Sequence, residues 1–268
     1  MTAVDMLLIV LGGFAAGAAN SVAGGGSFFS FPAMLAAGVP PVVANASNSV
    51  ALWPGSLAAA WGYRAELARM RPQLPGLCVA ALVGGMAGGL LLLAAGDAHF
   101  AQLIPWLLAF ATGLFAASPQ IAAWLKRRRL PQPQAPATDA STPPVVEQST
   151  TVVGWLAQCV VSVYGGFFGA GMGILMMASL SIAGHEDLHE VNALKNLLSS
   201  VVYSVTVLTF VTAGAISWPH TLIMLVAASA GGYIGVRLAR RLQGPWLRRV
   251  VIAVGLSLTT YYFLKTPG

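Results

Sequence analysis

The chain has 268 residues, of which 57% are hydrophobic and only 8% are charged, and its mean hydropathy is +0.75. Because soluble domains carry about 25% charged residues, this composition excludes a soluble globular protein and predicts a polytopic membrane protein. The formal net charge is +6, but the basic residues lie in short clusters between apolar runs, as in cytoplasmic loops of membrane proteins. No nucleic-acid-binding motif accompanies them, so the expected partner is the lipid bilayer and not nucleic acid.

Apolar runs follow one another along the chain. A membrane-spanning helix needs about 20 apolar residues, and we predict an all-α fold with about eight transmembrane helices. Two shorter apolar pieces, at 27–37 and 173–183, directly follow glycine clusters and are too short to cross alone. They predict a broken or re-entrant helix near each cluster. The long runs lie at about 4–22, 42–62, 74–95, 101–124, 151–169, 190–212, 220–240 and 247–264.

A polar stretch divides these runs into two groups. Residues 130–150 are rich in Pro, Ser, Thr and Gln, which is typical of a flexible linker. The basic residues from Lys126 to Arg129 precede it, so the linker is expected on the cytoplasmic side. We therefore predict an N-terminal transmembrane repeat at 1–125, a flexible cytoplasmic linker at 126–150 and a C-terminal transmembrane repeat at 151–268.

The two groups share motifs at one constant spacing of 147 positions. Loop 63–72 contains three arginines, whereas its counterpart at 213–219 contains no Lys or Arg; conversely, loop 95–100 is matched by 237–249, which contains five arginines. Equivalent loops thus prefer opposite sides of the membrane, which predicts two inverted-topology repeats. The matched pairs are Gly24 and Gly171, Asn45 and Asn192, Pro72 and Pro219, and Gly84 and Gly231.

The glycine clusters are the best candidates for a substrate site. An unwound stretch persists in a membrane only where it is buried in protein or lines a wet cavity. We predict unwound backbone at 20–27 and 169–173, each opening a short helix whose free N–H groups suit an anion. The predicted substrate-binding residues are Asn20, Gly24, Gly25, Gly26, Ser27, Asn45, Asn48, Gly171, Gly173, Asn192, Lys195 and Asn196.

Lys195 is the cation of this set. Asn192, Lys195, Asn196 and Ser199 fall on one face of a predicted helix, and that polar face is expected to look into the bundle. Because Lys195 is near the helix start, a lysine that snorkels to the headgroups is the alternative. Its amide neighbours favour an inward ammonium that attracts an anion.

Residues 185–189 spell H-E-x-x-H, the pattern of helical zinc hydrolases. No third ligand is evident, and the dense charges after Gly184 indicate a loop and a helix start, so we expect no metal and no cofactor. His185, His189 and Glu190 could instead couple transport to protons. An intramembrane zinc protease that uses His185, Glu186 and His189 stays open as an alternative, and so does an anion channel built on the same cavity.

Three stretches resemble the TauE/SafE sulfite exporter family: ANSVAGGGSFFSFPAML, GGFFGAGMGILMMASL and DLHEVNALKNLL. The resemblance covers nearly the whole chain. It implies a multi-pass transporter of the bacterial inner membrane, not an enzyme, that moves a small anion such as sulfite or an organosulfonate. No phosphate-binding loop for a nucleotide is present, so a gradient is expected to supply the energy. A homo-oligomer is compatible with the sequence.

Overall fold

The computed structural model describes residues 1–23, 25–70, 72, 74–128, 152–185, 187–239 and 244–265. Within these residues the chain is all-helical, and no strand is present. Gly24 lies outside the described residues, and so does the predicted linker apart from 126–128, which end a helix.

Every predicted apolar run forms a helix, and both short pieces form short helices. By length and hydropathy, three segments of the described chain qualify as membrane spans, at Ala3–Asn20, Leu74–Ile121 and His189–Thr212. The chain is thus a helical membrane protein, while the count of eight crossings stays a prediction. The helices are α1 (Ala3–Ala23), α2 (Ser27–Ala36), α3 (Pro41–Gly62), α4 (Arg64–Arg69), α5 (Leu74–Arg128), α6 (Val152–Phe167), α7 (Met172–Ile182), α8 (Leu188–Thr212), α9 (Trp218–Ala239) and α10 (Gly244–Lys265).

Helix α5 contains two of the predicted apolar runs, which are joined by a sharp bend at Gly96. There φ is +67°, a left-handed value that glycine adopts without a steric penalty. The neighbouring Asp97 carboxylate accepts a hydrogen bond of 2.8 Å from the backbone N–H of Val42, in the first turn of α3. Asp97 therefore satisfies one of the free N–H groups at the start of α3 and complements its positive end.

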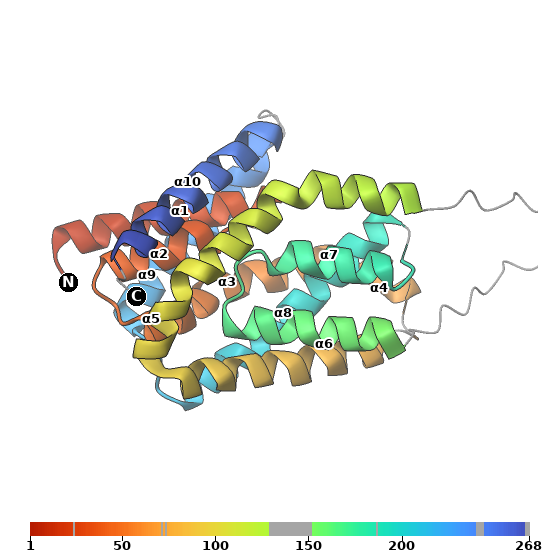
Figure 1. Ribbon diagram of the computed structural model, residues 1–268, viewed down its shortest axis with the longest axis horizontal. Coiled ribbons are helices and arrows are strands. Elements are labelled where there is room, and N and C mark those ends of the chain that lie inside the picture. Colours follow the sequence, from red (N-terminus) through yellow and green to blue (C-terminus); the bar gives the residue numbers. More distant parts are fainter. Residues whose placement is uncertain are drawn as a thin grey trace, which may run out of the picture.

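The helices recur in the same order on the two sides of the linker. Before the linker a long helix, a short helix and longer helices follow one another as α1, α2, α3 and the two arms of α5, and after it as α6, α7, α8, α9 and α10. The short helix α4 has no counterpart among the described residues of the second group, and the repeat itself stays a prediction. In Figure 1 the chain starts at the left end, leaves α5 for the linker at the right end, and returns to the left end, where the C-terminus lies. Helix α1 packs along α9, and α6 packs along α5, so each group contributes to the other's packing.

Glycines allow these helices to approach closely. A Cβ atom on Gly88 of α5 would lie 2.1 Å from the carbonyl oxygen of Val163 in α6. A Cβ atom on Gly231 of α9 would lie 2.0 Å from the carbonyl oxygen of Phe14 in α1. Small residues therefore set the spacing of both helix pairs, as is usual in membrane proteins.

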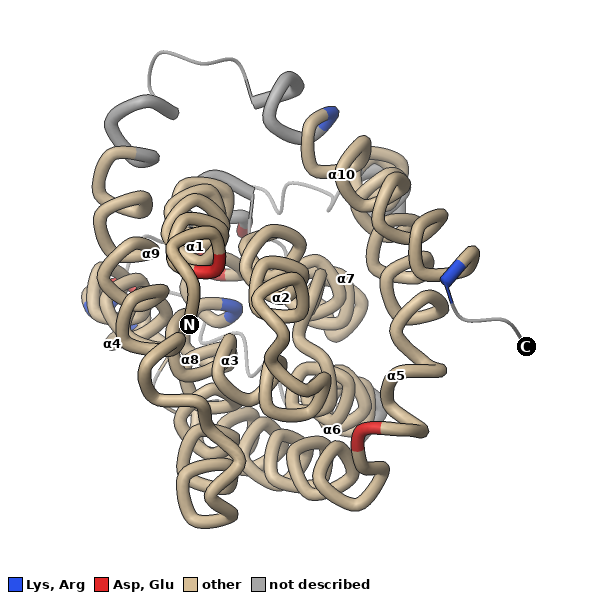
Figure 2. Tube along the Cα trace, turned by 90° about the vertical axis from the view of Figure 1, so that its left-hand side faces the viewer, with Lys and Arg blue, Asp and Glu red and all other residues tan. Residues whose placement is uncertain are grey.

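The outer surface is apolar, as expected for contact with lipid. Trp106, Val226 and Leu264 are 66%, 67% and 81% exposed. Figure 2, which looks from the end that holds the N-terminus, shows that charged residues are sparse along the described helices.

Candidate functional site

The two glycine breaks are shorter than the sequence predicts. Helix α1 continues through Asn20 to Ala23, and α2 begins at Ser27, so the predicted unwound stretch 20–27 is wrong at both ends. Gly173 likewise lies inside α7. The physical reason is that a backbone away from water closes every helical hydrogen bond it can.

At the second break, side chains satisfy the carbonyl groups that the helices leave open. Gly171 precedes α7 with a left-handed φ of +77°, which reverses the chain. The Tyr164 hydroxyl donates a 2.6 Å hydrogen bond to the carbonyl of Ala170. Asn45 Nδ2, from α3 in the first half, donates a 3.0 Å hydrogen bond to the carbonyl of Phe167. Side chains from both halves of the chain therefore stabilise this helix break through hydrogen bonds to its carbonyl groups.

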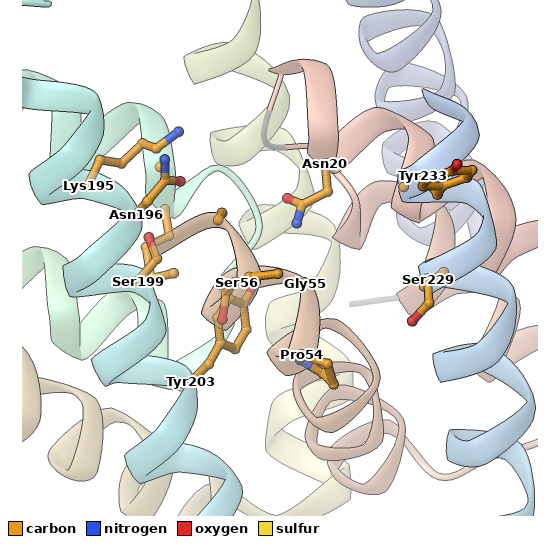
Figure 3. Close-up of a pocket in the computed structure, with 17 residues that line it drawn as sticks. Asn20, Pro54, Gly55, Ser56, Lys195, Asn196, Ser199, Tyr203, Ser229 and Tyr233 are labelled. Atoms are coloured by element: carbon orange, nitrogen blue, oxygen red, sulfur yellow. The ribbon is translucent and has the colours of Figure 1, made fainter. Parts of the chain in front are cut away.

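A cavity of about 490 Å³ lies among α1, α3, α7, α8 and α9. Four of the predicted binding residues line it: Asn20, Gly173, Lys195 and Asn196. In Figure 3, Lys195 and Asn196 point into the cavity from α8, and Asn20 faces them from α1. The N-terminal end of α7 also reaches the cavity, since Met172 and Gly173 line it.

Lys195 is the key electrostatic feature of this cavity. Within the described part of the chain, no hydrogen bond or ion pair joins its ammonium group to a protein partner. Its Cδ would lie 3.5 Å from a Cβ atom on Gly173, so that glycine leaves room for the lysine stem. An ammonium without a protein counter-ion, inside a helix bundle, is suited to bind an anion.

Further polar residues of the wall come from α3, α8 and α9. Ser199 shares the predicted polar face of α8 with Lys195, and Tyr203 lies one turn further along. The prediction placed Asn45 and Asn48 of α3 in the site but missed Pro54, Gly55 and Ser56 of the same helix. A Pro-Gly-Ser sequence inside an apolar run is a readable signal, because proline removes a backbone hydrogen bond from a helix. Ser229 and Tyr233 of α9 lie within an ordinary apolar run, so the sequence pattern gives no signal for them. The wall is completed by Pro54, Gly55, Ser56, Ala58, Ala59, Gly169, Ala228, Ser229, Gly232 and Tyr233.

Of the other predicted binding residues, those that the structure describes do not line this cavity. Asn48 Nδ2 donates a 3.2 Å hydrogen bond to Ser27 Oγ, and the Ser30 hydroxyl donates to Asn48 Oδ1, so these side chains join α2 to α3. A Cβ atom on Gly25 would lie 2.7 Å from the Phe115 ring, and one on Gly26 2.7 Å from the Ala16 carbonyl oxygen. The residues away from the cavity wall are Gly25, Gly26, Ser27, Asn45, Asn48, Gly171 and Asn192.

The two histidines of the H-E-x-x-H stretch do not have the geometry of a helical zinc hydrolase. His185 lies in the turn before α8 and is only 4% exposed, whereas His189 is exposed in the first turn of α8. Asp187 caps α8 by accepting a 2.8 Å hydrogen bond from the backbone N–H of His189. The two histidines therefore do not project from one helix, as a zinc hydrolase requires. In the described residues, no three His, Cys, Asp or Glu side chains are grouped to hold a metal ion.

Burial also affects the titration of His185. Its Nδ1 atom is buried and has no hydrogen-bond partner among the residues described. Because burial disfavours the charged imidazolium, the pKa of His185 is lowered from its ordinary value of 6.5. His185 is consequently a neutral side chain near pH 7.

In the described residues, helices with an apolar outer surface enclose a cavity that is bordered by a helix break and an unpaired lysine, and such an arrangement is typical of a membrane transporter. The chain belongs to the sulfite exporter TauE/SafE family, whose profile matches residues 9–262. This confirms the resemblance seen in the sequence, and it assigns the protein to membrane transport.

Relatives in three bacteria support this assignment. The chain is 24% identical to a "Probable membrane transporter protein" of Haemophilus influenzae, over 96% of this chain and 94% of the relative. It is 26% identical to the "Probable membrane transporter protein YfcA" of Escherichia coli K12, over 94% of this chain and 87% of the relative. It is also 26% identical to the "Probable membrane transporter protein ORF9" of a Sinorhizobium species, over 94% and 90%. No solved structure matches the chain.

Proposed function

We propose that the protein is a secondary transporter that exports small sulfur-containing anions, such as sulfite or organosulfonates, across the bacterial inner membrane. The observation that carries this proposal is the unpaired Lys195 ammonium, which shares the cavity with the amides of Asn20 and Asn196. The ammonium would offset the charge of the substrate, and the amide N–H groups would donate to its oxygens. The family name supports the sulfur-containing class.

The remaining predicted residues take a supporting role in this proposal. Asn45 holds the second break through the Phe167 carbonyl, and Asn48 ties α2 to α3. They would keep the short helices oriented toward the substrate without touching it. Gly24, Gly25, Gly26, Ser27, Gly171 and Asn192 stay candidates of the same kind.

The arrangement of the ends supports export from the cytoplasm. Helix α4, with Arg64 and Arg69, lies at the right end of Figure 1, where the chain also runs into the linker. By the positive-inside rule this end would be cytoplasmic, and the two halves would be inverted repeats. The cavity is lined by the part of α3 next to α4, so it would load from the cytoplasm. The proposed coupling ion is the proton, and His185, His189 or Glu190 would bind and release it during substrate transport.

The proposal is tested by substrate flux into inside-out membrane vesicles. Lys195→Ala should lower uptake of labelled sulfite or a simple sulfonate at least about tenfold at low substrate, because a hydrogen bond to a charged group contributes about 1.5–3 kcal/mol. Lys195→Arg should retain part of the uptake, since the positive charge is kept. Lys265→Ala is the matched control, because this lysine lies at the far end of α10 and should leave uptake unchanged.

Two results would contradict the proposal. One is uptake by Lys195→Ala that equals the parent for sulfite, simple sulfonates and thiosulfate alike. The other is uptake that rises linearly with substrate and never saturates, which is the behaviour of a channel and not of a transporter.

A further inference from the structure

Four phenylalanine rings form a compact cluster in the apolar core. We call it the ring cluster: Phe31 of α2, Phe100 of α5, and Phe167 and Phe168 at the end of α6. Their centroids lie 5.5 Å apart for Phe31 and Phe168, 6.2 Å for Phe31 and Phe100, and 5.6 Å for Phe100 and Phe167, all edge-to-face. The cluster therefore joins helices of the first half to α6 of the second half.

The ring cluster links the cavity to one end of the molecule. Phe168 directly precedes Gly169, which lines the cavity. Phe100 follows the bend of α5 at Gly96 by one helical turn, and Figure 1 shows this bend at the end that holds both termini. Phe31, Phe100 and Phe168 are at most 3% exposed, so these rings are packed inside the bundle on the side of the cavity where Phe168 precedes Gly169.

The sequence positions that match the ring cluster in the other half hold no aromatic residue. At the constant spacing of 147 positions, the counterparts of Phe167 and Phe168 are Asn20 and Ser21, and those of Phe31 and Phe100 are Ala178 and Leu247. None of these counterparts is aromatic, and Asn20 lines the cavity. The matched positions of the two halves therefore differ in aromatic content, and the rings are gathered in one place only among these positions.

We propose that the ring cluster is the gate that closes the transport path at the end that holds both termini. This inference rests on the proposed transport function. Packed rings form an apolar constriction that excludes water and hydrated anions until they separate. Because the rings come from both halves, movement of α2 and α5 against α6 opens the gate.

A polar detail beside the ring cluster favours its opening. Asn45 donates to the carbonyl of Phe167 through Nδ2, but its Oδ1 atom is buried and has no partner in the described chain. A buried acceptor without a donor costs free energy that is recovered when water reaches it. Aromatic packing therefore stabilises the closed gate, and the unsatisfied amide oxygen of Asn45 destabilises it.

Cysteine labelling tests the gate without any substrate. The reporter is Ser199→Cys in the cavity wall, in a chain whose native Cys78 and Cys159 are replaced by serine. In this background an impermeant maleimide should label the reporter from the α4 side only. Adding Phe31→Ala or Phe168→Ala should raise labelling from the terminus side at least about tenfold, because truncated rings no longer close the constriction.

The matched control is Phe210→Ala. Phe210 is fully buried in α8, outside the ring cluster, and its ring carbon Cε1 would lie 3.5 Å from a Cβ atom added to Gly89 of α5. The Phe210→Ala substitution removes a phenyl ring of the same size, and the Ser199→Cys reporter should still not be labelled from the terminus side. If an alanine variant fails to fold, Phe31→Leu and Phe168→Leu keep the apolar volume and should give a smaller rise in the same direction.

The gate proposal is contradicted if, in folded Phe31 and Phe168 variants, the Ser199→Cys reporter is labelled from the terminus side no faster than in the parent. It is equally wrong if Phe210→Ala labels as fast as they do. Since labelling requires no substrate, a failure of the Lys195 flux experiment leaves this readout unaffected, and the two proposals are judged separately.

Discussion

At the scale of single residues, His185 combines burial with an unpaired ring nitrogen. Its side chain is 4% exposed, and burial lowers its pKa below 6.5. In the unfolded chain the imidazole takes up a proton as the pH falls through 6.5, whereas the folded protein resists this uptake. Lower pH therefore favours the unfolded state, and above about pH 7 the histidine is neutral in both states and has no effect.

We predict that the parent loses thermal stability between pH 7 and pH 5, and that His185→Gln loses less over the same range. The measurement is the midpoint of thermal unfolding in detergent at each pH. His189→Gln is the control: His189 is exposed, so its replacement should keep the slope of the parent. Equal slopes for the parent and His185→Gln would show that the buried ring does not control this pH dependence.

The residues of the site were only partly predictable. Lys195, Asn196 and Ser199 of the predicted polar face of α8 line the cavity, whereas Asn192 of the same face does not, because helical periodicity predicts a shared face and not the depth of a cavity. Asn48 is polar and buried in α3, yet its amide bonds to Ser27 and Ser30 of α2. Whether a buried amide meets substrate or protein depends on the packing of α2 on α3, which no local pattern reveals.

At the scale of helices, the spacing of α5 and α6 depends on Gly88. A methyl group there would lie 2.1 Å from the backbone carbonyl of Val163, so Gly88→Ala must push the two helices apart. Overpacking of this kind costs about 1–3 kcal/mol. We predict a clear fall in the thermal unfolding midpoint of Gly88→Ala in detergent.

Gly113 in the same helix provides the comparison, since a Cβ atom there has no neighbour within 4 Å. Gly113→Ala should be neutral or stabilising by up to about 1 kcal/mol, because alanine favours a helix over glycine. If both variants unfold at the temperature of the parent, close packing at Gly88 is not what holds α5 to α6.

The helices themselves were predicted well and the breaks less well. Apolar runs of sufficient length have few alternatives to helix in a membrane, which is why each long run appears as a helix. The breaks were predicted too long because polar residues such as Asn20 look like loop residues in a sequence. Asn20 nonetheless completes the last turn of α1 and projects its amide into the cavity.

At the scale of the whole molecule, the N-terminus and α4 lie at opposite ends (Figure 1). We predict that they face opposite sides of the membrane. In a cysteine-free background, Thr2→Cys should react with an impermeant maleimide on intact spheroplasts, and Ala65→Cys should react only after lysis. Both positions are exposed, so reactivity reports sidedness and not burial. Labelling of both from the same side would refute the proposed orientation.

The unpaired Lys195 has an electrical consequence for the proposed cycle. With no carboxylate paired to it in the described chain, the empty cavity carries one positive charge, and a bound monoanion cancels that charge. A unit charge that crosses the full membrane field exchanges about 2.3 kcal/mol per 100 mV. The membrane voltage would therefore act on the conformational change of the substrate-free transporter, and it would have little effect on the conformational change of the substrate-bound transporter. The membrane potential of the cell would then set the rate at which the substrate-free transporter returns to its starting conformation.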